Sequence, residues 1–197
     1  MTQLAIVEKG DPILESPAKE LTLEEIKSAP IQKLIADYKL GLNERKINLD
    51  DDYIKFIRFG QHFIDKNGSG VLAYISNNSF IDGITHRQMR KHLLESFDKI
   101  FILDLHGNAK KKEVSQDGSP DNNVFDIMQG VSINLFVKTG KKNKNELGKV
   151  FHCDLQGKRE LKYKTLVEST ISSIDWKQLE ISAPYRFFVP KDFGLEQ

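Results

Sequence analysis

Several groups of polar side chains directly follow apolar segments in the middle of this sequence. The run Ser76-Asn77-Asn78-Ser79-Phe80 comes after one such segment, and its amides can hydrogen-bond a base edge or another ligand. The same polar residues can instead bond to nearby backbone and close a loop. Asn77, Asn78 and Phe80 are therefore predicted DNA contacts, with loop capping as the alternative.

A basic group follows within ten residues. Positions 86 and 90 share one helical face, as do positions 87 and 91, and the residues there are His86, Arg87, Arg90 and Lys91. Such a cluster can hold phosphates. We predict that Arg87 and Arg90 contact DNA, and a solvated helix face is the alternative.

Two lysine-rich segments lie farther along the chain. Lys110, Lys111 and Lys112 are consecutive, and the second group contains Lys141, Lys142 and Lys144. The two segments would form one basic rim if their loops met, although charge runs are usually only solvated. Lys110, Lys111 and Lys112 are predicted DNA contacts on this basis.

Three further residues have two possible roles each. Asp104 and His106 end an apolar run; Asp104 is either a buried, hydrogen-bonded acid or a catalytic one, and a lone histidine is more often structural. Phe125 lies beside amides and is predicted to stack on an extruded base, with a core position as the alternative. No catalytic residue is assigned, and no Cys or His cluster has the spacing of a metal site. The glycine-rich phosphate loops and the nucleophile elbow are absent from the sequence.

The elements that would position these residues centre on Gly70–Gly107. Val71–Ile75 and Ile100–Leu105 are apolar runs typical of strands, and Thr85 can cap a helix between them. This order predicts a β-α-β unit whose parallel strands are covered on both faces. Ligands bind at the carboxyl ends of such strands, so the functional edge is expected at residues 76–80 and 106–108.

The flanking segments extend the α/β pattern. Helical spacing predicts one helix over 31–38, ended by Gly41, and another after Asp50-Asp51-Asp52 that ends at Asn67-Gly68. Residues 131–137 and 150–155 are predicted to form a hairpin that closes the sheet edge.

The C-terminal part of the chain is expected to be more irregular. Residues 108–123 form a polar surface loop, and residues 157–170 form a charged helix with Leu161, Thr165 and Leu166 facing inward. The aromatic tail APYRFFVPKDF is expected to be extended and packed on the rest of the molecule.

The length, composition and net charge are those of an ordinary globular protein. Its 197 residues suit one domain, and 39% hydrophobic with 29% charged residues argues against disorder. A net charge of +1 gives no overall electrostatic field that would attract nucleic acid. Cys153 is the only cysteine, which excludes an internal disulfide and fits a reducing compartment. Without a signal peptide or a long apolar run, we expect a soluble cytoplasmic protein with no membrane partner.

Four blocks of this sequence carry a likeness to a known family. The blocks are LNERKINLDDDYIKFIRFGQHFI, GVLAYISNNSFIDGITHRQMRKHLLESFDKIFILDLHGNAKKKE, DNNVFDIMQGVSINLFVK and APYRFFVPKDF. They resemble the corresponding blocks of adenine-specific DNA methyltransferases, and the similar enzymes are the single-polypeptide (type ISP) restriction-modification enzymes, in which helicase, methyltransferase and specificity regions share one chain. The resemblance runs from about residue 31 to the end.

The resemblance implies a partial Rossmann-like sheet. In the family, S-adenosylmethionine binds a glycine-containing motif, and an Asn-Pro-Pro-Tyr or Phe motif holds the target adenine. Neither motif occurs here, since Pro12, Pro17 and Pro30 follow Asp, Ser and Ala. We therefore expect the later half of the domain, beginning just after the catalytic motif, with no cofactor and no methyl transfer by this chain alone.

The resemblance also implies a division of the chain and a set of partners. Residues 1–30 are a poorly defined segment, 31–157 are the C-terminal half of a methyltransferase-like α/β domain, and 158–197 are a helix and tail leading to a following region. Expected partners are double-stranded DNA, the missing half or another protein chain, and a second copy paired through an exposed sheet edge. The alternative is a non-catalytic DNA-binding or protein-interaction module.

Overall fold

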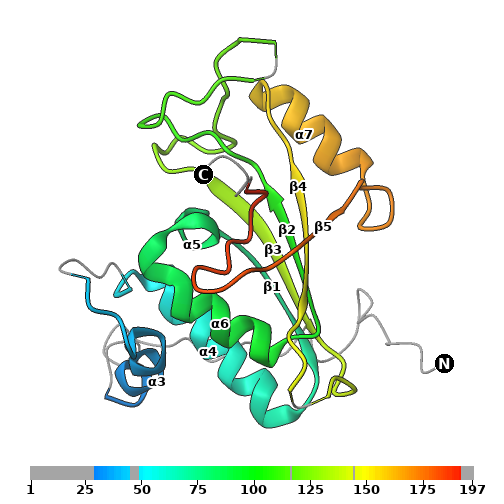
Figure 1. The fold of residues 1–197 in the computed structure, drawn as a ribbon. Helices are drawn as coiled ribbons and strands as arrows, with labels where there is room; N and C mark the ends of the chain where they lie inside the picture. The colour runs from blue at the N-terminus through cyan, green and yellow to red at the C-terminus, as the bar shows by residue number, and fades with distance from the viewer. Residues whose placement is uncertain (1–28, 45–48, 116, 144, 192–197) are drawn as a thin grey trace, which may run out of the picture.

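The computed structural model describes residues 29–44, 49–115, 117–143 and 145–191. It is a mixed α/β fold with one five-stranded mixed sheet and flanking helices, consistent with a Rossmann-like fold (Figure 1). The predicted segment 1–30 lies outside the described residues except for its last two. The elements are α3 (Ala29–Lys39), α4 (Asp52–Asn67), β1 (Gly70–Asn77), α5 (Ser79–Asp82), a 3₁₀ turn (Ile84–His86), α6 (Arg87–Ser96), β2 (Lys99–Asp104), β3 (Val131–Lys138), β4 (Lys149–Asp154), α7 (Arg159–Glu168) and β5 (Lys177–Leu179).

The strand order is β1-β3-β2-β4-β5. β3 is antiparallel to both β1 and β2, while β2 and β4 are parallel. β1 and β2 therefore run in the same direction, as the predicted β-α-β unit requires, but β3 separates them. The predicted hairpin of β3 and β4 is wrong, because β2 lies between these strands. The connection of ten residues, 139–148, is long enough to pass the amino end of β2, so no tight turn is needed.

The helices before the sheet form largely as their sequences predict. α4 begins at Asp52, where an acidic side chain favours the helix dipole, and ends at Gly68, whose φ of 86° suits glycine. α3 ends just before Gly41, which has a φ of 73°. Thr85 does not cap α6, because a 3₁₀ turn occupies residues 84–86 and α6 begins at Arg87.

The main core lies between these helices and one face of the sheet. Aromatic rings join its parts: Phe80 contacts Phe136 of β3, and Phe97 contacts Phe136 from the end of α6. Phe188 of the tail is fully buried against Phe80, and its backbone N–H donates to the Ile81 carbonyl at 2.8 Å. The predicted packing of the aromatic tail is confirmed.

A smaller core lies on the opposite face, under α7. Leu103, Leu105, Val124 and Val131 are buried there. The prediction that Leu161 faces inward is wrong, since its side chain is 53% exposed. The fully buried residue is its neighbour Lys162, whose ammonium donates to the Leu105 and Asn122 carbonyls and to Asp121. Those acceptors would lack a partner if an aliphatic side chain took its place.

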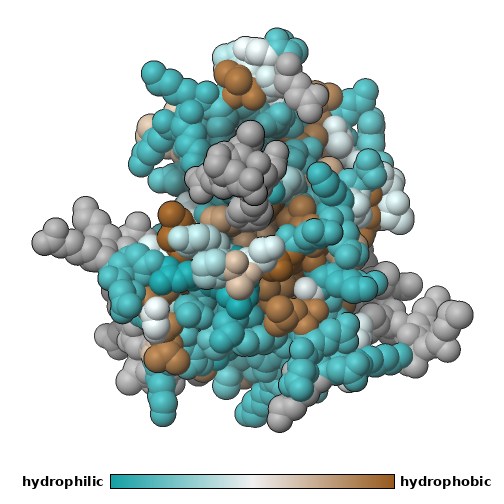
Figure 2. Space-filling model, viewed as in Figure 1, coloured by the Kyte–Doolittle hydropathy of each residue, from teal (hydrophilic) through white to brown (hydrophobic). Residues whose placement is uncertain are grey.

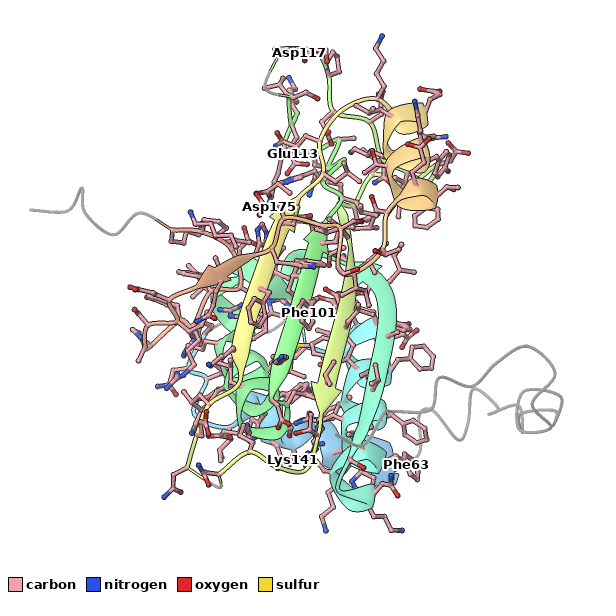
Figure 3. All side chains as sticks on the ribbon, turned by 90° about the vertical axis from the view of Figure 1, so that its right-hand side faces the viewer. Phe63, Phe101, Glu113, Asp117, Lys141 and Asp175 are labelled. Atoms are coloured by element: carbon pink, nitrogen blue, oxygen red, sulfur yellow. The ribbon has the colours of Figure 1, made fainter. Side chains whose placement is uncertain are left out.

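The rest of that face is apolar and only partly covered by the described residues. Figure 3 shows Phe101 in the middle of it, where its ring stacks on Phe151 at 4.9 Å and meets Trp176 at 5.2 Å. On β1, Val71 is 54% and Ile75 42% exposed. Among the described residues β1 pairs only with β3, so its outer edge presents unpaired backbone groups. The expected cover on both faces is thus incomplete.

The surface in Figure 2 is mostly hydrophilic, with hydrophobic residues in separate places. Within the described ranges, no helix has both the length and the apolar character needed to cross a membrane.

Candidate functional site

Polar side chains gather where β1, β2 and β4 end. These three strands run in the same direction, so their carboxyl ends share one edge of the sheet. A pocket of about 280 Å³ opens there. Its polar lining residues are Asn78, Asp82, Asp104, His106, Lys111, Glu113 and Asp154.

Asp104 is the buried acid of this pocket, with 4% of its surface exposed. Its Oδ1 accepts two hydrogen bonds, from Asn78 Nδ2 at 2.8 Å and from the His106 backbone N–H at 3.0 Å. Both hydrogen bonds fix the orientation of the carboxyl group. The predicted alternative of a buried, hydrogen-bonded acid is confirmed for Asp104.

His106 lies between three carboxylates. Its Nε2 is 2.8 Å from Asp154 Oδ1, and its Nδ1 is 3.8 Å from Asp104 Oδ2 and 3.9 Å from Glu113 Oε1. Burial lowers the pKa of His106, but the hydrogen bond to Asp154 and the three negative charges outweigh it, so the net pKa is raised. The backbone φ of 51° is the left-handed conformation, which is uncommon for residues other than glycine.

Glu113 reaches the pocket because Asn108 organises the loop before it. The Asn108 backbone N–H donates to Glu113 Oε2 at 2.7 Å. Its side-chain Oδ1 accepts from the N–H groups of Lys110 and Lys111. The Lys111 ammonium in turn lies 3.6 Å from Asp82 across the pocket. The start of the polar loop is therefore folded over the sheet edge.

The predicted Asn77–Phe80 contacts separate into different roles. Asn77 Oδ1 accepts from the Ser79 N–H and hydroxyl, which is the predicted loop capping, at the start of α5. Asn78 lines the pocket and holds Asp104. Phe80 is fully buried in the main core, so the prediction that it contacts DNA is corrected: an aromatic ring with no exposed surface cannot stack on a base.

The two arginines predicted to contact phosphate, Arg87 and Arg90, have different surroundings. Arg90 is fully buried, and its guanidinium donates to the Phe80, Gly83 and Tyr185 carbonyls. It holds the tail against α6, and its predicted phosphate contact is corrected because these acceptors occupy its donors. Arg87 forms a two-point ion pair with Glu44, and this hydrogen bond lowers the pKa of Glu44.

The two lysine-rich loops do not meet. Figure 3 shows Glu113, next to the first run, and Lys141 near opposite ends of the sheet. The predicted common basic rim is therefore wrong, because β3 spans the length between the loops. Lys142 instead donates to the Leu94, Glu95 and Phe97 carbonyls at the end of α6. Lys144 lies outside the described residues.

Phe125 lies on an exposed loop beside the pocket, with 42% of its surface accessible. The alternative of a core position is wrong for this residue. Arg159 braces the loop by donating to the Asn123 and Phe125 carbonyls and to Asp126. The predicted stacking role of Phe125 stays a prediction, and the ring is accessible for it.

Sequence spacing missed the partners of Asp104 and His106. The fold brings one ligand atom each from Asp104, His106 and Asp154 within 4.8 Å of one another. Asp104 and Asp154 are paired residues of the parallel strands β2 and β4, so each acid ends an apolar strand at the same level. That repeated pattern was the available signal, but its use required knowing that β2 and β4 are neighbours.

Comparison with known proteins gives structural likeness alone. No family model matches the chain, and no curated protein matches its sequence. One similar structure is a cryo-EM structure of a DrdV–DNA complex, with a TM-score of 0.66 and 25% identity over 83% of this chain and 15% of that one. Another is the ATP-dependent type ISP restriction-modification enzyme LlaBIII bound to DNA, with a TM-score of 0.65 and 25% identity over 86% of this chain and 11% of that one.

A third similar structure is a nuclease-deletion mutant of the type ISP enzyme LlaGI in complex with a DNA substrate mimic. Its TM-score is 0.69 at 22% identity, over 87% of this chain and 14% of that one. This chain thus spans between 11% and 15% of the length of the three proteins. Its structural neighbours include type ISP restriction-modification enzymes bound to DNA.

Proposed function

We propose that this chain is a DNA-contacting part of an adenine methyltransferase domain from a restriction-modification system. The observation that carries the proposal is its likeness to two DNA-bound proteins, DrdV and LlaBIII, over more than four-fifths of its length. The DNA-facing side is the carboxyl edge of the sheet, where open α/β sheets bind their ligands.

The surface beside the pocket supports this orientation. The Ala109 N–H donates to the Met128 carbonyl at 3.1 Å, so the loops 108–113 and 124–130 lie side by side. The first loop exposes Lys110–Lys112. The second exposes apolar side chains, with 42% of Phe125, 46% of Ile127 and 54% of Met128 accessible. Lysines attract phosphates, and neighbouring aromatic or apolar side chains stack on bases or enter base steps.

Methyl transfer requires more than this surface. We propose that S-adenosylmethionine and the amine of the target adenine are held by another part of the domain, and that residues 29–191 alone do not transfer a methyl group. The resemblance supports this division, because its cofactor and Asn-Pro-Pro-Tyr motifs precede the matching blocks. Titration calorimetry with S-adenosylmethionine tests it, and tight binding by this chain would contradict it.

DNA contact is tested by fluorescence anisotropy of a labelled duplex over a range of salt concentrations. The triple variant Lys110→Ala/Lys111→Ala/Lys112→Ala should weaken binding. If all three lysines contact phosphates, the negative slope of log K against log salt should become shallower by about 2.7, because each contact contributes roughly 0.9.

The matched control removes the same charge from the far end of the sheet. Lys99, Lys141 and Lys149 are exposed and lie at the start of β2, after β3 and at the start of β4. Their replacement by alanine should leave the slope nearly unchanged. An equal loss of affinity in the two triple variants would show that DNA binding, if present, does not use the carboxyl edge.

A protein-interaction module is the second candidate, and the outer edge of β1 favours it. That strand exposes backbone groups together with Val71 and Ile75. Another part of the domain, another protein or a second copy could add a strand there. Loss of association without loss of DNA binding in β1 variants would separate the two roles.

A further inference from the structure

We infer that Asp104, His106 and Asp154, with Glu113 beside them, form a binding site for a divalent transition-metal ion such as Mn²⁺ or Zn²⁺. The four residues come from the ends of β2 and β4 and from the folded loop after β2. Metal binding goes beyond DNA contact and does not depend on it.

The distances between the candidate ligand atoms suit one ion. Nitrogen and oxygen ligands bind such ions at about 2.0–2.2 Å, so neighbouring ligands lie roughly 3–4 Å apart. His106 Nε2 is 2.8 Å from Asp154 Oδ1, and the other ring nitrogen, Nδ1, is 3.8 Å from Asp104 Oδ2 and 3.9 Å from Glu113 Oε1. One of these two nitrogens would bind the ion. One atom each of Asp104, His106 and Asp154 lies within 4.8 Å of the others.

Two carboxylates are also oriented in advance. Asp104 Oδ1 is held by Asn78 and by the His106 N–H, which leaves Oδ2 on the side of the imidazole. Glu113 Oε2 is held by the Asn108 N–H, and Oε1 approaches the same ring. Hydrogen bonds of this kind to the outer oxygen of a ligating carboxylate are typical of metal sites.

A buried histidine lies behind the cluster. His152 is 1% exposed, and its Nδ1 is 3.6 Å from Asp154 Oδ2. Its Nε2, on the other side of the ring from Asp154, has no hydrogen-bond partner among the described residues. The Nδ1 side of the ring therefore backs the Asp154 carboxylate, and Nε2 takes no part in the proposed site.

The charge of the pocket favours a cation. Asp82, Asp104, Glu113 and Asp154 face one lysine, Lys111, and His106. One imidazole among carboxylates suits Mn²⁺ or Zn²⁺ better than Ca²⁺, which prefers oxygen ligands alone. The competing explanation is that His106 is simply protonated and binds the acids as an ion pair, with no metal.

Mn²⁺ titration of the whole chain, with free Mn²⁺ followed by electron paramagnetic resonance, separates the two explanations. We expect one bound equivalent. Asp154→Asn should weaken binding at least tenfold, because it removes a ligand oxygen from a half-exposed side chain without disturbing the core. Asp175→Asn is the matched control, as an exposed acid on the turn before β5, and it should bind Mn²⁺ like the wild type.

A second variant tests the nitrogen ligand. In His106→Gln, Zn²⁺ affinity should fall more than Mn²⁺ affinity, because zinc gains more from imidazole. Circular dichroism and urea unfolding without metal must show that both variants are folded. The absence of Mn²⁺ and Zn²⁺ binding by the wild type, or binding equal in Asp154→Asn and wild type, would overturn the inference and leave the protonated ion pair.

Discussion

Buried cations explain several contacts that spacing alone could not reveal. Arg90 and Lys162 are both fully buried, and each donates to carbonyls from segments distant in sequence. Spacing predicted a phosphate contact or a solvated helix face for Arg90 and gave Lys162 no role, because a basic residue on a helix is usually solvated. Their acceptors belong to the tail and to the loop after β2, whose paths no local pattern encodes.

Replacement of Lys162 should therefore be strongly destabilising. Lys162→Met keeps the length of the side chain but leaves Asp121 buried without its 2.8 Å partner. We expect a loss of about 3–5 kcal/mol in the free energy of unfolding, the usual cost of an unpaired buried charge. Urea unfolding measures it, and Lys164→Met on the exposed side of the same helix is the control, with a change within about 0.5 kcal/mol. Similar effects of the two substitutions would contradict the buried ion pair.

His86 should make the fold sensitive to acid. The pKa of His86 is lowered to about 4, mainly by burial and also by the charge of Arg90, which the opposite effect of Asp82 does not offset. The unfolded chain then binds more protons than the folded chain between about pH 6.5 and 4, so stability falls as the pH falls through this range. Relative to an ordinary value near 6.5, this pKa corresponds to roughly 3 kcal/mol.

Urea unfolding at several pH values between 7 and 4 checks the His86 effect. Because the pKa of His152 is also lowered by burial and that of His106 is raised, the wild-type curve alone is not sufficient. The informative quantity is the difference from His86→Gln, which lacks the titrating ring. If that difference does not change with pH, His86 does not titrate as the structure implies.

Among the secondary-structure elements, sequence patterns located helices and strands well and their partners poorly. Gly68 and Gly41 end α4 and α3 in left-handed conformations, and such local signals are readable from the sequence. The placement of β3 between β1 and β2 was not readable, because all these strands are apolar and any of them could occupy the centre. For the same reason, Asp104 and His106 were assigned to the functional edge without Asp154 and Glu113.

Gly148, the residue before β4, allows a test of where β4 lies. A Cβ on Gly148 would lie 2.2 Å from the Phe97 carbonyl oxygen, beside the bond that the Gly148 N–H donates to the Leu94 carbonyl. Gly148→Ala should cost about 1–3 kcal/mol, because backbone must move to make room. Gly118→Ala adds the same methyl group in open space at a φ of 80° and should cost no more than roughly 1 kcal/mol. A Gly148→Ala protein as stable as the wild type would place β4 differently.

At the scale of the whole molecule, the described residues leave one sheet face and one sheet edge partly uncovered. Chain length and composition predicted one globular domain, and the alternation of helices and strands predicted the α/β fold. The alternation also led to an expectation of cover on both faces, and on the second face the described residues provide it only under α7 and the turn that follows. Exposed apolar strands with an open edge favour association with another chain.

Self-association should therefore depend on β1. We expect the apparent mass in light scattering to rise with protein concentration, and Val71→Lys/Ile75→Lys to reduce that rise. The control is Leu161→Lys/Val167→Lys on α7, which replaces side chains that are 53% and 86% exposed and adds the same charge. A mass independent of concentration in the wild type, or equal suppression by both pairs, would exclude the β1 edge.

The position of β3 between β1 and β2 has a consequence for synthesis on the ribosome. β1 and β2 are translated by residue 104, but each is hydrogen-bonded to β3, which ends at Lys138. Until that strand leaves the exit tunnel, the helices already made can gather only around two unjoined strands. Sheet formation is therefore delayed while the loop between β2 and β3 is translated. During this delay the nascent chain exposes strand edges that chaperones recognise.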